Sequence, residues 1–207
     1  MNVILDYDSG NLDSVLRGFL DAGIDSIISK EVPDIKEATS LVLPGVGAFG
    51  DAMDALKKSG LIPLIKEHVK QEKFLFGICL GMQLLYEKGY EHGVFEGLGL
   101  IHGSVKYLDI EMKVPHMGWN QLSFFKPQDP ILSKIKENDH VYFVHSYYVE
   151  SNHEELVSYT MYETLIPAIV RKNNIYGTQF HPEKSGSVGA RILQAYKEIL
   201  DDYLSSD

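Results

Sequence analysis

Cysteine is almost absent from this chain of 207 residues, which contains a single one, Cys79. One cysteine cannot form an intrachain disulfide, so a disulfide-stapled secreted scaffold is excluded. The chain also lacks an apolar run long enough to cross a membrane, and its first residues lack the features of a signal peptide. We therefore expect a cytoplasmic protein that does not bind a membrane and whose thiol stays reduced.

Positive charge is in short supply as well. The 19 lysines and arginines are outnumbered by 29 aspartates and glutamates, which gives a formal net charge of −10. Binding to a phosphate backbone requires a basic surplus that displaces counterions, so we expect no nucleic-acid partner. Metal-ligand spacing is also missing, since there is no second cysteine and no His-x-x-x-His pair. We expect neither a metal ion nor another cofactor.

The first half of the chain alternates short apolar runs with amphipathic stretches. This alternation is typical of a parallel sheet covered by helices. Apolar residues make up 44% of the chain, and no repeat or linker interrupts it, so residues 1–207 are expected to form one domain. Strands are expected at 3–5, 25–29, 41–43 and 74–78, and helices at 11–22, 51–58, 61–71 and 80–88.

The second half changes character, because strand-like runs joined by turn residues fill residues 99–179. The run 141–149 is rich in β-branched and aromatic residues, which favours a strand. Runs at 166–170 and 175–180 flank a predicted hairpin turn at Lys172-Asn173-Asn174. A helix is expected at 188–204. The sequence thus predicts an α/β fold with a mostly parallel central sheet flanked by helices and additional antiparallel strands in the second half.

The one cysteine lies where a strand is expected to turn into a helix. Gly77 and Gly81 stand two residues on either side of it, which is the Gly-x-nucleophile-x-Gly pattern of a nucleophile elbow. A sulfur at a helix N-terminus feels the positive end of the helix dipole, which favours the thiolate. The amide of Leu80 would then point toward a developing oxyanion. The alternative is that Cys79 is a small buried apolar residue.

A cysteine nucleophile needs a base, and the base needs a group that orients it. His181 follows a predicted strand and precedes a proline, and Glu183 stands two residues further on. In an open parallel sheet the strand ends carry the ligand site, so His181 is the candidate base and Glu183 the orienting group. The alternative is a buried histidine turn capped by a carboxylate. We expect His68, His92 and His153 to be solvated surface residues.

A glycine-rich turn, Pro44-Gly45-Val46-Gly47, follows another predicted strand. Backbone N–H groups in such a turn are accessible and can bind a phosphate or an oxyanion. The phosphate interpretation is the weaker one, because the chain has no Gly-x-x-x-x-Gly-Lys-Ser/Thr run.

The two main motifs, Gly77-Ile78-Cys79-Leu80-Gly81-Met82-Gln83 and His181-Pro182-Glu183, resemble those of the class I (triad) glutamine amidotransferases. Four segments extend this resemblance over the whole chain, to the glutaminase subunits of imidazole glycerol phosphate synthases. They are residues 6–12, 43–53, 115–120 and 181–185, and the Met-Gly-Trp-Asn run at 117–120 is the most discriminating. Asp8 departs from the pattern, which has glycine there, and this puts only the shape of that loop in question.

The resemblance implies that the chain hydrolyses glutamine to glutamate and ammonia through a cysteine thioester. The triad would be Cys79, His181 and Glu183. Backbone amides of Leu80 and of the 45–47 turn would hold the oxyanion. The implied oxyanion and substrate-binding residues are Gly45, Val46, Gly47, Leu80, Gln83, Glu91, His145, Ser146 and Tyr147.

The resemblance also implies a partner, a (β/α)8-barrel cyclase subunit that forms a heterodimer with this chain. Ammonia would pass to the cyclase, which makes imidazole glycerol phosphate and aminoimidazole-carboxamide ribotide in histidine biosynthesis. Glutaminase activity is expected to stay low until the partner binds its ligand. The implied interface residues are Asn11, Trp119, Asn120, Tyr142 and Lys184. For Trp119, the only tryptophan, the alternative is packing in the core.

Other interpretations stay open at this point. One is a non-catalytic module that keeps a glutamine-like pocket. A second is an amidotransferase subunit that serves pyridoxal phosphate or purine synthesis. A third is a DJ-1-like or peptidase relative with a different acid partner.

Overall fold

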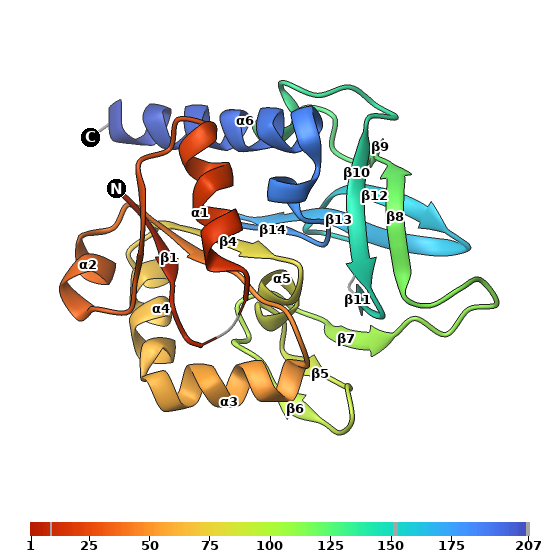
Figure 1. The fold of residues 1–207 in the computed structure, drawn as a ribbon, viewed down its shortest axis with the longest axis horizontal. Helices are drawn as coiled ribbons and strands as arrows, with labels where there is room; N and C mark the ends of the chain where they lie inside the picture. Colours follow the sequence, from red (N-terminus) through yellow and green to blue (C-terminus); the bar gives the residue numbers. More distant parts are fainter. Residues whose placement is uncertain (9, 151–152, 206–207) are drawn as a thin grey trace.

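A central sheet with helices on both faces forms the frame of the molecule, as seen in a computed structural model that describes residues 1–8, 10–150 and 153–205 (Figure 1). Ser9, within the 6–12 segment that carries part of the family resemblance, lies outside the described residues. Asp8 beside it has a φ of +62°, so a non-glycine residue holds the left-handed conformation where the family pattern has glycine.

Eight strands form the central sheet, in the order β2-β1-β3-β4-β14-β13-β12-β9. The strands from β2 to β14 are parallel, and β13, β12 and β9 continue the sheet in antiparallel pairing. This arrangement confirms the predicted fold class. The strands are β1 (Asn2–Leu5), β2 (Ser26–Ser29), β3 (Ser40–Leu43), β4 (Phe74–Ile78), β9 (Ser123–Phe124), β12 (Leu156–Tyr162), β13 (Thr164–Lys172) and β14 (Ile175–Thr178).

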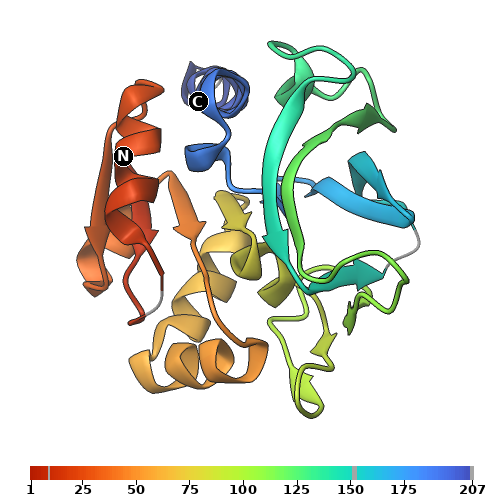
Figure 2. The same ribbon diagram turned by 45° about the vertical axis from the view of Figure 1, so that its right-hand side comes forward.

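Helices cover both faces of the sheet (Figure 2). On one face α2, α3 and α4 each bury an apolar stripe in one core cluster. Ile35, Leu56 and Ile65 are buried members of these stripes. On the other face Phe19 of α1 and Tyr196 of α6 pack edge to face in a second cluster. The helices are α1 (Leu12–Asp21), α2 (Val32–Glu37), α3 (Phe49–Ser59), α4 (Leu61–Lys70), α5 (Leu80–Leu84) and α6 (Gly186–Ser205), with short 3-10 turns η1 (Pro130–Leu132) and η2 (Pro182–Lys184).

Two smaller sheets accompany the central one, and they divide the run 141–149. Its first part, β10 (His140–His145), pairs with β8 (His116–Gln121). Its second part, β11 (Tyr147–Glu150), pairs with β7 (Ser104–Tyr107), which continues to β5 (Lys88–Gly89) and β6 (Phe95–Glu96). The strand therefore breaks at Ser146, because the two parts hydrogen-bond to different neighbours. The hairpin predicted at Lys172-Asn173-Asn174 is confirmed, since Lys172 pairs directly with Ile175.

The helix expected at 80–88 is shorter than predicted, because α5 ends at Leu84. Backbone N–H groups of a later loop take its last carbonyls: Leu98 donates to Leu84 O at 2.8 Å and Leu100 to Leu85 O at 2.9 Å. Lys88 then enters β5. A distant segment thus terminates this helix, and the local pattern does not contain that information.

His92 and His153 are exposed, as predicted, but the prediction for His68 was wrong. Its side chain is buried, and its Nε2 donates to the Phe74 carbonyl oxygen at 3.0 Å. Leu61, Ile65 and His68 recur at helical spacing and share the buried face of α4. The polar neighbours of His68 belong to the opposite face.

Three neighbouring parallel strands bring the predicted motifs to one edge of the sheet. In the register, Leu43 of β3 lies beside Gly77 of β4, and Thr178 of β14 lies beside Ile78. The segments that follow these strands are the glycine-rich turn, Cys79 and the residues up to His181. Since parallel strands end at the same edge, the three segments meet there.

Candidate active site

Cys79 occupies a tight turn between β4 and α5, with φ +52° and ψ −109°. This conformation is strained for a residue with a side chain, and it is the feature that defines a nucleophile elbow. A Cβ on Gly77 would lie 2.7 Å from the Gly81 carbonyl oxygen, and one on Gly81 would lie 1.8 Å from the Leu43 carbonyl oxygen. Both glycines are therefore required by close backbone contacts, as the sequence pattern predicts.

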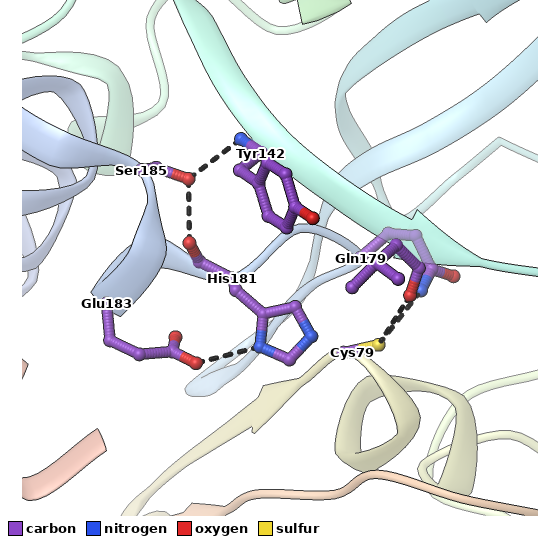
Figure 3. Close-up of polar contacts among 7 residues, drawn as sticks. Cys79, Tyr142, Gln179, His181, Glu183 and Ser185 are labelled. Carbon is purple, nitrogen blue, oxygen red and sulfur yellow. Dashed lines mark hydrogen bonds and ion pairs between the residues drawn. The ribbon is translucent and has the colours of Figure 1, made fainter. Parts of the chain in front are cut away.

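His181 and Glu183 form a buried pair on the η2 turn (Figure 3). The imidazole Nδ1 donates to Glu183 Oε1 at 2.8 Å, which fixes the tautomer and leaves the other ring nitrogen on the side that faces the Cys79 sulfur. Burial alone would lower the pKa of His181, but the neighbouring Cys79 and Glu183 outweigh burial and raise the pKa to about 9. The environment thus favours the imidazolium form.

The η2 turn is attached to β10 by a ring of three hydrogen bonds, of which Figure 3 shows the two that Ser185 makes. The His181 amide donates to the Tyr142 carbonyl oxygen at 3.1 Å. The Tyr142 amide donates to Ser185 Oγ at 3.0 Å, and that hydroxyl donates to the His181 carbonyl oxygen at 2.7 Å. Ser185 therefore links the backbone of the η2 turn to the backbone of β10, although the two segments do not pair in one sheet. Ser185 was not predicted as a site residue from the sequence.

A pocket of about 280 Å³ opens at the elbow. It is lined by all the residues that the sequence predicted for substrate and oxyanion binding except Gly45, and by Cys79 and His181 of the predicted triad but not by Glu183. The residues that line it are Val46, Gly47, Cys79, Leu80, Gln83, Glu91, Val144, His145, Ser146, Tyr147, His181 and Lys184.

The glycine-rich turn packs directly on the elbow. The Tyr7 hydroxyl donates to the Pro44 carbonyl oxygen at 2.5 Å and anchors the start of the turn. A Cβ on Gly45 would lie 2.9 Å from the Gly81 amide nitrogen, so only glycine allows this approach. Gly47 has a φ of +95°, and the Val46 side chain is 48% exposed. The backbone of this turn therefore borders the pocket beside Cys79.

Glu91 reaches the pocket from the loop after β5. Its Oε2 accepts from the Phe49 amide at 2.7 Å and caps the N-terminus of α3, where Ala48 offers no capping side chain. The family resemblance implies that Glu91 binds the substrate. The half-buried Glu91 carboxylate thus lies both at the N-terminus of α3 and in the wall of the pocket.

His145 lies in the pocket wall but is held neutral. Its Nδ1 donates to the Tyr147 carbonyl oxygen, its Nε2 meets His116 Nδ1, and His116 Nε2 meets Asn120 Oδ1, each at 2.9 Å. Burial lowers the pKa of His145 to about 3, with the neighbouring His116 contributing, and burial also lowers the pKa of His116. With both ring nitrogens of His145 engaged, His181 is the pocket histidine that is suited to act as a base.

The Cys79 sulfur has two further polar neighbours that the sequence analysis missed. The Val144 carbonyl oxygen lies 3.8 Å from Sγ, and Gln179 Nε2 lies 3.7 Å from it. Gln179 is fully buried. Its position between β14 and His181 was visible in the sequence as the last residues of a predicted strand, but nothing in the local pattern linked it to the sulfur.

The residues predicted for a partner interface lie around the η2 turn and the β8–β10 pair. Trp119 is 54% exposed, so core packing is excluded for it, and its ring meets Tyr142 edge to face at 5.9 Å. Asn11 and Lys184 are exposed, and Asn120 is half-buried. Both α1 and β10 contact η2, so these residues flank the same turn that carries His181.

No group of three or more His, Cys, Asp or Glu residues suited to a metal ion occurs within residues 1–8, 10–150 and 153–205. None of the helices in that part of the chain has the length and apolar character needed to span a membrane.

Comparisons with known proteins identify the family and the fold of the chain. The family model of the class I glutamine amidotransferases matches residues 3–196. Solved structures with this fold include a glutamine amidotransferase, with a TM-score of 0.74 at 17% identity over 96% of this chain and 98% of the other. Another is the glutaminase domain of Trypanosoma brucei CTPS, with a TM-score of 0.69 at 14% identity over 97% and 93%. At these identities the likeness concerns the fold alone.

Curated relatives share far more sequence. The imidazole glycerol phosphate synthase subunit HisH of Lactococcus lactis is 51% identical over 95% of this chain and 97% of its own length. Its counterpart in Oceanobacillus iheyensis is 48% identical over 97% and 100%, and that of Bacillus subtilis is 44% identical over 95% of both. The chain therefore belongs to the class I glutamine amidotransferases and, within them, to the HisH family of imidazole glycerol phosphate synthase subunits.

Proposed function

We propose that this chain hydrolyses glutamine to glutamate and ammonia through a thioester on Cys79. The observation that carries the proposal is the alignment, at one pocket, of a strained elbow cysteine with a buried imidazole–carboxylate pair. A nucleophile, a base and a group that orients the base are the parts that acyl transfer needs.

The proposed reaction uses His181 twice. The imidazole takes the thiol proton, and the thiolate then attacks the carboxamide carbon of glutamine. The imidazolium gives that proton to the departing amino group, which leaves as ammonia. Water attacks the resulting thioester with His181 again as base, which releases glutamate and restores the thiol. Glu183 stabilises the imidazolium in both halves through its hydrogen bond to Nδ1.

Two backbone groups are proposed to hold the oxyanion. Leu80 is the first residue of α5, so its N–H has no hydrogen-bond partner within the helix. This N–H lies at the positive end of the helix dipole, next to the pocket. The second donor would come from the 45–47 turn. Loss of one such donor lowers the rate roughly a hundredfold to a thousandfold. Gly47, Gln83, Glu91 and the segment 145–147 would bind the rest of the glutamine molecule.

The family names describe subunits of a synthase, and we propose that the partner here is the (β/α)8-barrel cyclase, in the cytoplasm. Protonated ammonia is not a nucleophile, so direct transfer into the barrel is favoured over release into water. The exposed Trp119, whose ring meets Tyr142 edge to face, is suited to bind that partner. The products would be imidazole glycerol phosphate and aminoimidazole-carboxamide ribotide.

The test is glutamate release by the wild-type chain and by Cys79→Ala, each with and without the cyclase and its ribonucleotide. We expect turnover by the wild-type complex and a loss of more than about a thousandfold in Cys79→Ala. Mass spectrometry of the wild-type chain mixed with glutamine and quenched in acid should show the glutamyl adduct on the peptide that contains Cys79. Hydrolysis that survives in Cys79→Ala would contradict the mechanism, and a complex that binds glutamine without turnover would support the non-catalytic module instead.

Two further outcomes test whether the activity depends on the cyclase and whether the cyclase is the correct partner. Full glutaminase activity of the isolated chain would contradict the expected dependence on the cyclase. Activation by an acceptor enzyme of pyridoxal phosphate or purine synthesis, but not by the cyclase, would overturn the proposed pathway.

A further inference from the structure

The Cys79 sulfur lies between a hydrogen-bond acceptor and a hydrogen-bond donor. On one side is the Val144 carbonyl oxygen, at 3.8 Å, which can accept only from a protonated thiol. On the other side is the side-chain amide of Gln179, 3.7 Å away (Figure 3). Contacts to a large sulfur atom are longer than those to oxygen, so both neighbours are within reach.

The direction of the Gln179 amide follows from a series of buried hydrogen bonds. The Tyr147 carbonyl oxygen can only accept, and Gln83 Nε2 donates to it at 2.8 Å. The second hydrogen of the same nitrogen goes to Gln179 Oε1 at 3.0 Å. With its oxygen facing Gln83, Gln179 must turn its nitrogen toward Cys79.

The side-chain amides in this series of hydrogen bonds are fixed in orientation and shielded from water. Gln179 is fully buried and Gln83 is 4% exposed, so water does not compete for their amides. The Tyr147 carbonyl also accepts from His145 Nδ1 at 2.9 Å, which uses its second lone pair. A buried amide that has no alternative orientation is a preorganised dipole, which acts on charge without a cost of reorientation.

We propose that Gln179 is a catalytic residue whose side-chain N–H stabilises the Cys79 thiolate. The inference rests on the proposed glutaminase reaction. Sulfur carries negative charge before it attacks the amide and again when it leaves the thioester, and at both points it gains the Gln179 hydrogen bond and loses the contact with Val144. Since Gln179 is neutral, it supports the anion without competing with His181 for the proton. Gln83 is then a positioning residue, because both of its amide hydrogens hold the series in this direction.

The test uses the fact that Cys79 is the only cysteine, so alkylation by iodoacetamide reports on one thiol. The rate of alkylation is measured against pH for the wild-type chain and for Gln179→Met, which keeps the volume but not the donor. We expect alkylation at neutral pH to slow by about tenfold to a hundredfold and its pH midpoint to move upward, as for a lost hydrogen bond to a charged group. In the complex, kcat should fall by a similar factor with KM nearly unchanged.

Thr178→Val is the matched control. Thr178 is the buried neighbour of Gln179 in the sequence, and its hydroxyl has no hydrogen-bond partner within the part of the chain that the structure describes. We expect wild-type alkylation and turnover from this variant. An alkylation profile of folded Gln179→Met that matches the wild type would overturn the proposal.

A second measurement needs no variant. The side-chain amide resonance of Gln179 in the wild-type chain should shift with pH at the midpoint seen for alkylation, and a resonance that does not respond would overturn the proposal even if Gln179→Met fails to fold. The outcomes also separate the two proposals. A Gln179-dependent thiol in a complex that never hydrolyses glutamine would contradict the proposed function and leave the thiolate interaction standing.

Discussion

Gly81 is the residue on which the elbow depends most directly. A Cβ there would lie 1.8 Å from the Leu43 carbonyl oxygen, and neither backbone can yield without moving β3 or α5. We predict that Gly81→Ala lowers the free energy of unfolding by more than about 3 kcal/mol. Gly99→Ala is the control, because a Cβ there would meet only open space. Its φ of +65° alone should cost about 1–2 kcal/mol. Urea denaturation of both variants checks this, and equal losses would contradict it.

His68 is a buried residue that makes the fold sensitive to acid. Burial, the largest cause, lowers its pKa from 6.5 to about 4. The unfolded chain therefore binds a proton that the folded chain refuses, so stability is complete above pH 6.5 and is lost as the pH falls toward 4. The loss at pH 4 is about 3 kcal/mol. In His68→Gln, whose amide can still donate to Phe74 O, the dependence of stability on pH between 6.5 and 4 should be visibly flatter. An unchanged slope would assign the acid sensitivity to other groups such as His145.

At the scale of elements, the η2 turn depends on one hydroxyl for its attachment to β10. Ser185→Ala removes the acceptor for the Tyr142 amide and the donor to the His181 carbonyl. We predict that kcat for glutamine falls about tenfold while KM changes little, because the loss displaces the base rather than the substrate. Ser187 is exposed in the following helix, and Ser187→Ala should behave as wild type. A KM effect alone would contradict a positioning role for Ser185.

The elements themselves were predictable to the extent that their signals are local. The parallel half follows from apolar runs and amphipathic stretches of the chain itself, and the strands at 3–5 and 74–78 lie within β1 and β4. The early end of α5 and the break at Ser146 were not predictable, because hydrogen bonds from distant segments determine both. The short helix α2 has only one fully buried apolar residue, Ile35, which gives too weak a pattern to detect.

The same distinction applies to the site. Cys79, His181 and Glu183 could be predicted because glycine spacing and a strand end mark them in the sequence. Gln179 and Ser185 could not, since their roles arise from hydrogen bonds to residues 100 and 43 positions away along the chain. Side-chain amides and hydroxyls that act across segments leave no periodic signal.

For the whole molecule, we predict that the surface around Trp119 decides whether the chain joins the proposed cyclase partner. Trp119 is 54% exposed, and exposed tryptophans at an interface commonly dominate its affinity. We predict that Trp119→Ala weakens association with the cyclase by roughly 30-fold or more. Phe125, an aromatic residue that is 49% exposed and outside the predicted interface, provides the control. Isothermal titration with the cyclase measures both, and equal affinities for Phe125→Ala and Trp119→Ala would contradict the predicted surface.

The position of β14 in the sheet has a consequence for the order in which this site comes into being. The strand lies beside β4, yet Gln179 is 100 residues further along the chain than Cys79. A ribosome adds about 5 to 20 residues per second, so the thiol is synthesised roughly 5 to 20 s before its base. Until β14 pairs with β4, Cys79 has neither His181 nor Gln179 beside it. The groups of this site can therefore come together only after the chain has been synthesised as far as His181, more than 100 residues beyond the thiol.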